Sequence, residues 1–352
     1  MTTATATPPT VLTRKDFASP VAIRWCPGCG DYSILTAIQG VLPTLGIPKE
    51  KFVFVSGIGC SSRFPYYMNT YGFHTIHGRA PAVATGVKVA NPDLQVWVIT
   101  GDGDALSIGG NHFIHALRRN VDLKIILFNN KIYGLTKGQY SPTSSVGTVS
   151  PSTPFGSVDQ PLSPLSLALG AEAGFVARTS DNDVKHMTEI FQAAAAYKGA
   201  AIVEVLQNCV IFADDVHEPY YCRATKQDTL LYLKHGEPLR FGKEHEKGLV
   251  LNGMRIESKA NPAEDEVLRH DEKEPSSTLA FMLSRLGHPE YPVPVGVFRN
   301  VERPLFHDAI HQQIETAKQK SPKSGRGMGR VSGRRAGIRA PRMRAEAAGR
   351  CM

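Results

Sequence analysis

The sequence predicts an α/β fold: a doubly wound parallel sheet with helices on both faces. Short apolar stretches alternate with helix-like segments between residues 31 and 206. Two of these stretches, 96–99 and 125–128, are apolar without polar alternation, which is typical of strands buried on both faces. Repeated strand–helix–strand order then favours parallel pairing through right-handed crossovers.

The elements are expected in the following order. Helices are predicted at 31–42, 81–90, 107–118, 163–169 and 183–198, with Asp31 capping the first and Pro81 at the start of the second. Strands are predicted at 52–55, 95–100, 123–128, 175–178 and 201–206. The segment 133–161 is dense in Gly, Ser, Thr and Pro, and it predicts a long loop of the kind that often carries function.

The chain divides into four expected segments: a flexible amino terminus (1–20), the α/β domain (21–222), an arm for subunit contact (223–316) and a basic low-complexity tail (317–352). The tail has eleven Lys or Arg against one Glu, and it accounts for the net charge of +8. Its few large apolar residues predict disorder, and we do not expect nucleic-acid binding. No apolar run approaches the ~20 residues of a membrane span, and no signal peptide is visible, so we expect a cytoplasmic protein without a membrane partner.

Polar side chains follow two of the predicted strands. Asp102 comes directly after one strand and Asn130 after the next. Ligands in doubly wound sheets lie beyond the carboxyl ends of the strands, so we expect these two side chains to meet. Their oxygens and the backbone carbonyl of Ile132 would suit a Mg²⁺ ion that bridges two phosphates.

Glycines flank the first of these residues. Gly101 and Gly103 would let the backbone approach a diphosphate, and the helix from about residue 107 would point its amino terminus at it. The tripeptide Gly-Asp-Gly alone is equally compatible with an ordinary strand-to-loop turn. The Asn pair at 129–130 favours the binding site.

Cysteines form a second constellation. Cys26 and Cys29 make a CxxC pair, and Cys60 and Cys209 follow singly. Four thiolates complete an iron–sulfur ligand set, whereas a zinc ribbon normally has two close pairs. A thioredoxin-like redox pair and a buried free thiol at Cys209 stay as alternatives, and a reducing cytoplasm favours metal binding over disulfides. Two further cysteines, Cys222 and Cys351, have no pairing pattern.

Residues 21–220 closely resemble the β subunit of 2-oxoacid:ferredoxin oxidoreductases, especially the 2-oxoglutarate (KorB-type) branch. The spacing of Gly-Asp-Gly and Asn-Asn resembles the diphosphate motif of thiamine diphosphate (ThDP) enzymes. The wider resemblance depends on an ordered series of motifs: CPGCG at 26–30, GIGC at 57–60, HTIHGR at 74–79, GDGD at 101–104, YGLTKGQ at 133–139, SPT at 141–143, and Cys209.

The resemblance implies three cofactors. A [4Fe-4S] cluster would be ligated by Cys26, Cys29, Cys60 and Cys209, and Mg²⁺ would be held by Asp102, Asn130 and the Ile132 carbonyl. The residues expected to bind the cofactors, ThDP above all, are Gly59, Cys60, His77, Gly101, Asp102, Gly103, Asp104, Asn130, Ile132, Gly134 and Leu135.

The resemblance also implies the reaction and its partners. ThDP would decarboxylate 2-oxoglutarate, the cluster would pass electrons to ferredoxin, and coenzyme A would collect the succinyl group. The Glu that activates ThDP in such enzymes lies in a separate pyrimidine-binding domain, and we find no second domain of that type in this sequence. We therefore expect an α subunit to supply it, and the isolated β subunit to be inactive.

Substrate contacts are expected from Arg63, His74, Arg79 and Leu135. Either arginine could pair with a distal carboxylate or form a structural ion pair, and His74 could equally be structural. Leu135 lies where the family varies its substrate preference, so pyruvate or broad 2-oxoacid use stays open. A cluster-free ThDP decarboxylase would leave the cysteines unexplained, and a non-catalytic metal-binding scaffold would leave the Gly-Asp-Gly and Asn-Asn spacing unexplained.

Overall fold

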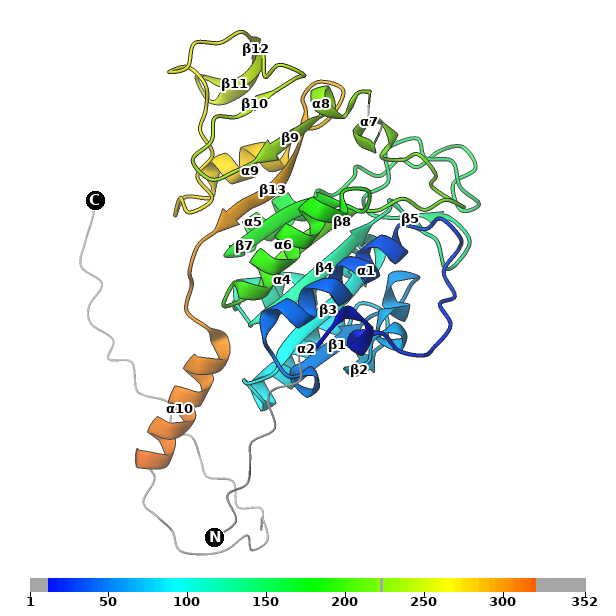
Figure 1. Ribbon diagram of the computed structural model, residues 1–352, viewed down its shortest axis with the longest axis vertical. Helices are drawn as coiled ribbons and strands as arrows, with labels where there is room; N and C mark the ends of the chain where they lie inside the picture. The colour runs from blue at the N-terminus through cyan, green and yellow to red at the C-terminus, as the bar shows by residue number, and fades with distance from the viewer. Residues whose placement is uncertain (1–11, 222–223, 321–352) are drawn as a thin grey trace, which may run out of the picture. The chain divides into compact units, whose positions relative to one another are not determined.

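A computed structural model describes residues 12–221 and 224–320 of the chain, and its core is an eight-stranded sheet (Figure 1). The spatial order is β2-β1-β3-β4-β8-β7-β13-β9. All neighbours pair in parallel except β13 and β7, so the predicted doubly wound α/β class is confirmed. The strands are β1 (Phe52–Ser56), β2 (Tyr71–His74), β3 (Gln95–Gly101), β4 (Leu123–Asn129), β7 (Phe175–Ser180), β8 (Ala201–Leu206), β9 (Leu230–Leu233) and β13 (Val293–Asn300).

Helices cover both faces of the sheet. Alternate strand residues face opposite layers, so Phe52 and Phe54 join one buried cluster while Val53 and Val55 join the other. The cluster that contains Phe52 and Phe54 lies under α1 and α6, which are drawn in front of the strands in Figure 1. The bounds of these covering helices are α1 (Asp31–Val41), α6 (Val184–Ala196), α2 (Ala80–Ala90), α4 (Gly110–Arg118) and α5 (Pro164–Gly170).

Two helix starts differ from the expectation. The segment 107–118 is not one helix: α3 (Asp102–Leu106) begins directly after β3, and α4 begins only at Gly110. The helix breaks at Ser107, whose ψ of −107° lies outside the helical range. Only glycine fits at position 109, because a Cβ there would lie 2.4 Å from the carbonyl oxygen of Asp104. The expected cap of α1 was also wrong, because Gly30 is the capping residue and Asp31 is the first, buried residue of the helix.

Several short elements were not predicted. Strand β2 is exposed along its whole length, so it lacks the apolar pattern that reveals a strand. A small hairpin of β5 (Ile132–Tyr133) and β6 (Gln139–Tyr140) opens the predicted long loop. The 3₁₀ helices are η1 (Arg14–Phe17), η2 (Leu42–Leu45), η3 (Lys49–Lys51) and η4 (Ser61–Tyr67).

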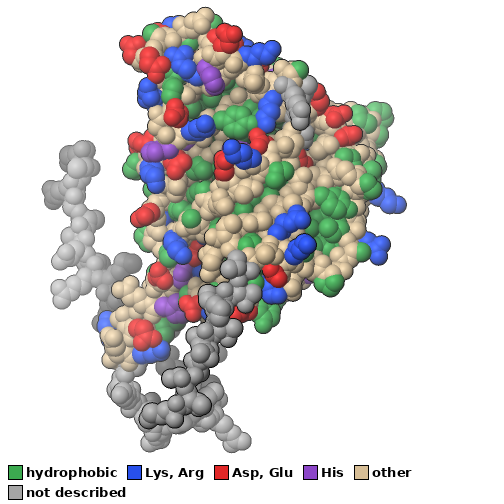
Figure 2. Space-filling view, in the orientation of Figure 1, with side chains coloured by type: hydrophobic (Ala, Val, Ile, Leu, Met, Phe, Trp, Pro, Cys, Tyr) green, Lys and Arg blue, Asp and Glu red, His purple; other side chains and the backbone are tan. Residues whose placement is uncertain are grey.

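The segment expected as an arm contributes β9 and β13 to the central sheet, so it is continuous with the α/β domain. It also forms a three-stranded antiparallel sheet, over which acidic and basic side chains are interspersed (Figure 2). Its role in subunit contact stays a prediction. The remaining elements are α7 (Glu218–Tyr221), α8 (Lys226–Thr229), β10 (Arg240–Phe241), β11 (Lys247–Asn252), β12 (Arg255–Ala260), α9 (Thr278–Ser284) and α10 (Phe306–Lys320).

Parts of the two expected terminal segments lie outside the described residues: 1–11 of the amino terminus and 321–352 of the tail. Among the described residues, no helix combines the length and apolar character needed to cross a bilayer.

Candidate active site

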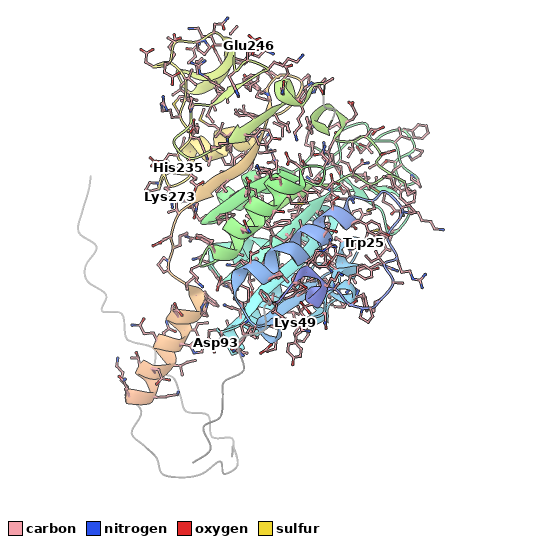
Figure 3. The ribbon with its side chains drawn as sticks, viewed as in Figure 1. Trp25, Lys49, Asp93, His235, Glu246 and Lys273 are labelled. Atoms are coloured by element: carbon pink, nitrogen blue, oxygen red, sulfur yellow. The ribbon has the colours of Figure 1, made fainter. Side chains whose placement is uncertain are left out.

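Four neighbouring parallel strands, β1, β3, β4 and β8, end at the same edge of the sheet. Figure 3 shows Trp25 at this end, while Lys49 and Asp93, which shortly precede β1 and β3, lie at the other. The loop 57–60, Asp102, Asn130 and the segment 207–209 each follow one of these strands. The predicted cofactor residues are therefore brought together where such sheets bind ligands.

Asp102 is buried and held by hydroxyl groups from the loop after β6. Its Oδ2 atom accepts hydrogen bonds from Ser141 Oγ at 2.6 Å and from Thr143 Oγ1 at 2.5 Å. Burial raises the pKa of this carboxyl group to about 6, although the two hydroxyl donors oppose the rise. A cation beside Asp102 would reverse the effect of burial, which suits the predicted role as a Mg²⁺ ligand.

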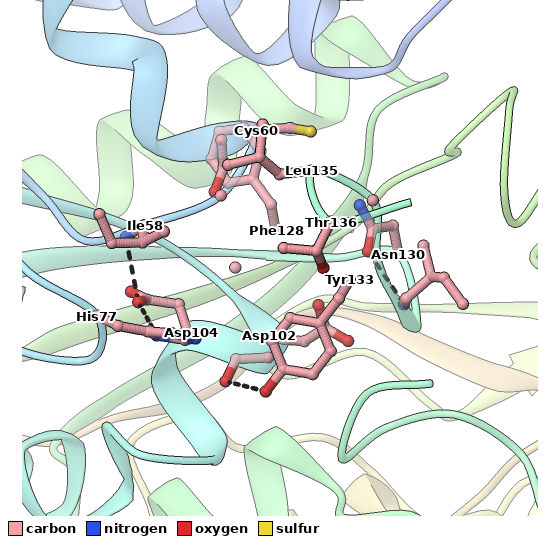
Figure 4. A pocket seen from close by; sticks show the side chains of 16 residues that line it. Ile58, Cys60, His77, Asp102, Asp104, Phe128, Asn130, Tyr133, Leu135 and Thr136 are labelled. Atoms are coloured by element: carbon pink, nitrogen blue, oxygen red, sulfur yellow. Dashed lines mark hydrogen bonds and ion pairs between the residues drawn. The ribbon is translucent and has the colours of Figure 1, made fainter. Parts of the chain in front are cut away.

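Asn130 and Ile132 line the same pocket as Asp102 (Figure 4). The backbone N–H of Ile132 donates to Asn130 Oδ1 at 3.2 Å, which fixes the orientation of this amide. The preceding Asn129 has a different role: its amide donates to Glu204 Oε1 at 2.7 Å and so joins β4 to β8. Only the second Asn of the pair thus faces the pocket.

Asp104 organises the loops around the pocket. Its Oδ1 accepts from the backbone N–H groups of Ile58 and Gly78 at 3.1 and 2.7 Å, and it lies 2.7 Å from Nδ1 of His77 (Figure 4). Its other oxygen accepts from the Thr100 hydroxyl at 2.7 Å. Asp104 therefore orients the His77 ring through Nδ1, which leaves Nε2 as the ring nitrogen that could reach a ligand.

Gly103 lies against an aromatic ring. A Cβ at this position would lie 2.3 Å from Cε1 of Tyr133. The Tyr133 hydroxyl donates to the Gly103 carbonyl at 2.9 Å, which holds the ring beside the glycine. The structure thus shows close approach of an aromatic side chain at this glycine, and close approach of the diphosphate stays a prediction.

The pocket formed by these groups has a volume of about 90 Å³. Its lining residues are Ile58, Gly59, Cys60, Ser61, His77, Gly101, Asp102, Gly103, Asp104, Phe128, Asn130, Ile132, Tyr133, Gly134, Leu135 and Thr136.

The four predicted cluster ligands line one adjoining pocket, although they come from three distant parts of the chain. A Cβ on Gly134 would lie 3.6 Å from Cys209 Sγ and 3.7 Å from Cys60 Sγ. The two pockets share Cys60, Asn130, Gly134 and Leu135. This places the predicted cluster site directly beside the predicted diphosphate site.

The thiol groups of Cys29 and Cys60 resist ionisation. Burial raises the pKa of Cys60 to about 12, with the nearby carboxyl group of Asp31 adding to the effect. The same two causes raise the pKa of Cys29 further. Iron would compensate this cost and hold the thiolates, so the donor set fits a cluster. Across the described residues, however, no three His, Cys, Asp or Glu side chains converge as the ligands of one metal ion. Cys222 and Cys351 lie outside those residues.

A third pocket lies on the other side of residues 58–59. It is lined by Arg63, His74 and Leu135 from the predicted substrate set, and also by Arg24. Leu135 borders all three pockets. Arg79 lies apart from them, because it lines none of the three and donates to the carbonyl of Ile108 at 3.1 Å.

Several residues of the site were not assigned a role from the sequence: Arg24, Tyr133, Ser141, Thr143 and Gln207. Three of them belong to motifs of the family series, and that series was a usable signal. Arg24 and Gln207 each lie within two residues of a predicted cysteine ligand, so proximity along the chain was the only clue to them.

Comparison with known proteins agrees with this geometry. Residues 57–205 match the family model of the thiamine pyrophosphate enzyme C-terminal TPP-binding domain. The chain is 54% identical over 311 residues to the 2-oxoglutarate oxidoreductase subunit KorB of Mycobacterium tuberculosis, covering 88% of this chain and 83% of that protein. It is 47% identical over 199 residues to the 2-oxoacid:ferredoxin oxidoreductase subunit beta of Saccharolobus solfataricus, covering 56% and 65%.

Among solved structures, the 2-oxoglutarate:ferredoxin oxidoreductase from Magnetococcus marinus with 2-oxoglutarate, coenzyme A and succinyl-CoA bound matches with a TM-score of 0.71 and 34% identity. The match covers 87% of this chain and 91% of that one. Together with the strand-end site, these matches show that the chain belongs to the β subunits of the 2-oxoacid:ferredoxin oxidoreductases and is most similar to the KorB branch.

Proposed function

We propose that the chain is the β subunit of a 2-oxoglutarate:ferredoxin oxidoreductase, which converts 2-oxoglutarate and coenzyme A to succinyl-CoA and CO₂. The observation that carries this proposal is the contact between two pockets. One is lined by Asp102, Asn130 and Ile132 and the other by four cysteines, and they share Cys60 and the Gly134–Leu135 turn. Neighbouring sites suit a reaction in which electrons leave the substrate one at a time.

The chain's own groups have the following proposed roles. Asp102, Asn130 and the Ile132 carbonyl would hold Mg²⁺ and the diphosphate of ThDP, and the four cysteines would hold a [4Fe-4S] cluster. Bound ThDP would supply the electron sink for decarboxylation, and the cluster would supply a one-electron acceptor. His77, held by Asp104, would donate a hydrogen bond inside the pocket.

The third pocket is the proposed place for the distal carboxylate of 2-oxoglutarate. Arg63 and Arg24 both line it, and guanidinium groups bind carboxylates through paired hydrogen bonds. Leu135, which borders this pocket and the other two, would lie between the carboxylate and the reacting carbon. An α subunit would complete the site with the Glu that activates ThDP, and ferredoxin would accept the electrons.

The test uses the protein purified without oxygen and co-expressed with its candidate α subunit. We expect 2-oxoglutarate- and coenzyme A-dependent reduction of a viologen dye, which disappears in Asp102→Ala and Cys29→Ala. A brown, ThDP-loaded complex that reduces the dye only with pyruvate would change the substrate and keep the reaction type. A colourless complex that is inert with both substrates would refute the proposal.

A further inference from the structure

Gln207 lies between the two proposed cofactor sites. It is the first residue after β8, and its side chain is 1% exposed. Its backbone N–H donates to the carbonyl of Asn129 at 3.0 Å, which extends the pairing of β8 with β4 by one step. The backbone at Gln207 is therefore fixed by both β8 and β4, the central strands that end at the site.

Hydrogen bonds run in one direction from Ile132 through Asn130 and Gln207 to Cys29. The Ile132 N–H donates to Asn130 Oδ1, so Nδ2 of that amide is directed at Gln207, whose Oε1 accepts it at 2.8 Å. The nitrogen of the Gln207 amide then faces the other way. It donates to the Asn208 carbonyl at 2.5 Å and to Cys29 Sγ at 3.4 Å.

The direction of this series of hydrogen bonds has a chemical consequence. Each amide can satisfy its neighbours in only one orientation, because oxygen must meet N–H at every link. The series ends with the Gln207 N–H group directed at the Cys29 sulfur, where a thiolate is a better acceptor than a thiol. At its other end, the Asn130 amide nitrogen is directed at Gln207, and the Asn130 oxygen, which accepts from the Ile132 N–H, keeps a second lone pair for a metal ion.

We propose that Gln207 is a positioning residue that serves both cofactors: it orients Asn130 as a Mg²⁺ ligand and donates a hydrogen bond to the cluster ligand Cys29. This inference rests on the proposed function, since it takes Asn130 and Cys29 as ligands. N–H groups directed at cluster sulfurs stabilise the more negative, reduced state and so raise the reduction potential. Partners of metal ligands fix ligand orientation, and their loss typically weakens metal binding about 10- to 100-fold.

Two substitutions separate the two effects. Gln207→Met is close in size but has no amide, so it should lower the cluster potential and weaken Mg²⁺ binding in the presence of ThDP by about 10- to 100-fold. Gln207→Glu keeps an oxygen for Asn130 but replaces the N–H at Cys29 with an oxygen. It should lower the cluster potential at least as much, with Mg²⁺ affinity within a few-fold of the wild type.

The experiment uses the assembled complex, purified without oxygen. The cluster potential is measured by dye-mediated titration followed by electron paramagnetic resonance, and Mg²⁺ affinity by calorimetry with ThDP present. The matched control is Gln192→Met, the same change at an exposed position of α6, and it should leave both values unchanged.

A brown Gln207→Met complex with wild-type potential and Mg²⁺ affinity would overturn this inference and leave the proposed function intact. Loss of iron from both Gln207 variants would also overturn it, because Gln207 would then be required for assembly rather than for tuning. A wild-type complex without iron–sulfur absorption would refute the proposed function itself.

Discussion

Thr143 Oγ1 lies 2.5 Å from Oδ2 of Asp102, although the two residues are forty-one positions apart. The same threonine oxygen lies 2.9 Å from Oδ1 of Asn129. It thereby ties the loop after β6 to the ends of β3 and β4, where the proposed Mg²⁺ ligands lie. The loop thus fixes the orientation of the one carboxylate in that proposed ligand set.

Thr143→Val removes this hydroxyl and keeps the shape of the side chain. We expect Mg²⁺ affinity in the presence of ThDP to fall about 10- to 100-fold, because Asp102 loses a partner that orients it. Calorimetric titration of the assembled complex measures the affinity. Thr148→Val in the same loop is the control, since the Thr148 hydroxyl donates only locally, to the Ser145 carbonyl. Equal affinities for the two variants would contradict the assigned role.

Gly103→Ala places a methyl group where the Tyr133 ring lies. The ring must move, so we expect the free energy of unfolding to fall by about 1–3 kcal/mol and ThDP binding to weaken. Gly110→Ala is the control, because a Cβ there meets nothing within 4 Å and alanine favours the helix α4. Denaturant unfolding measures stability, and a Gly103→Ala protein as stable as Gly110→Ala would refute the argument.

Each of the four proposed cluster cysteines should be required for the brown absorption of the protein. Cys209→Ala should abolish the brown absorption and the bound iron of the anaerobic protein, because the pocket would retain three of its four thiols. Cys222→Ala, at a position without a pairing pattern in the sequence, should keep both. Iron analysis and visible spectroscopy measure the effect. A colourless wild type that binds zinc would instead support a structural metal site.

Arg63→Met should raise the KM for 2-oxoglutarate much more than the KM for pyruvate, because only the first substrate has a distal carboxylate to pair with a guanidinium group. Arg79→Met is the matched control, since Arg79 lines none of the three pockets of the site. Steady-state kinetics of the assembled complex with both substrates measure the ratio. Equal increases for the two substrates would remove Arg63 from the substrate site.

Asp122 carries a buried charge at the other end of the sheet. Its carboxylate lies 2.8 Å from Lys88 Nζ and 2.7 Å from Lys124 Nζ. Burial raises its pKa, but the ammonium groups of Lys124 and Lys88 outweigh burial, so the pKa falls to about 2. Removing this carboxylate would leave two buried ammonium groups without their counter-ion. Asp122→Asn should therefore destabilise the protein by about 3–5 kcal/mol.

The pH dependence of this effect has a definite sign. A folded-state pKa below the unfolded value of 3.8 stabilises the folded protein above pH 4, and this contribution is lost as the pH falls toward 2. The stability difference between wild type and Asp122→Asn should be constant from pH 5 to 7 and shrink below pH 4. Asp93→Asn is the control, because the Asp93 side chain is 80% exposed and its ion pair with Lys51 is long, at 3.8 Å. Its effect should stay below about 1 kcal/mol at every pH.

The central sheet and the place of the site follow from local pattern. Unbroken apolar stretches predict the strands, and the rule that ligands lie beyond strand ends brings Asp102, Asn130 and Cys60 to one edge. Local sequence patterns do not predict which distant residues pack together. Asp31 is buried near Asp181, which is far away in the sequence. Burial raises the pKa of Asp31 to about 7, and the nearby carboxyl group of Asp181 contributes to the rise.

The hydrogen bond from Gln207 to Cys29 joins residues 178 positions apart, and no spacing rule reveals such a contact. The same is true of β13, which returns more than a hundred residues after β7 to pair with it in the antiparallel direction. Periodicity predicts that a segment is a strand, but it does not state which strand is its neighbour.

The pairing of β13 with β7 decides which shortened forms of this protein can be handled in the laboratory. A chain ending near residue 222 would leave β7 at the border of the sheet, with a row of open backbone N–H and C=O groups. Such a border invites pairing with other molecules, so we expect that fragment to aggregate even though every proposed cofactor ligand is present in it. Studies of the cofactor sites should therefore retain the chain through the end of β13 at Asn300.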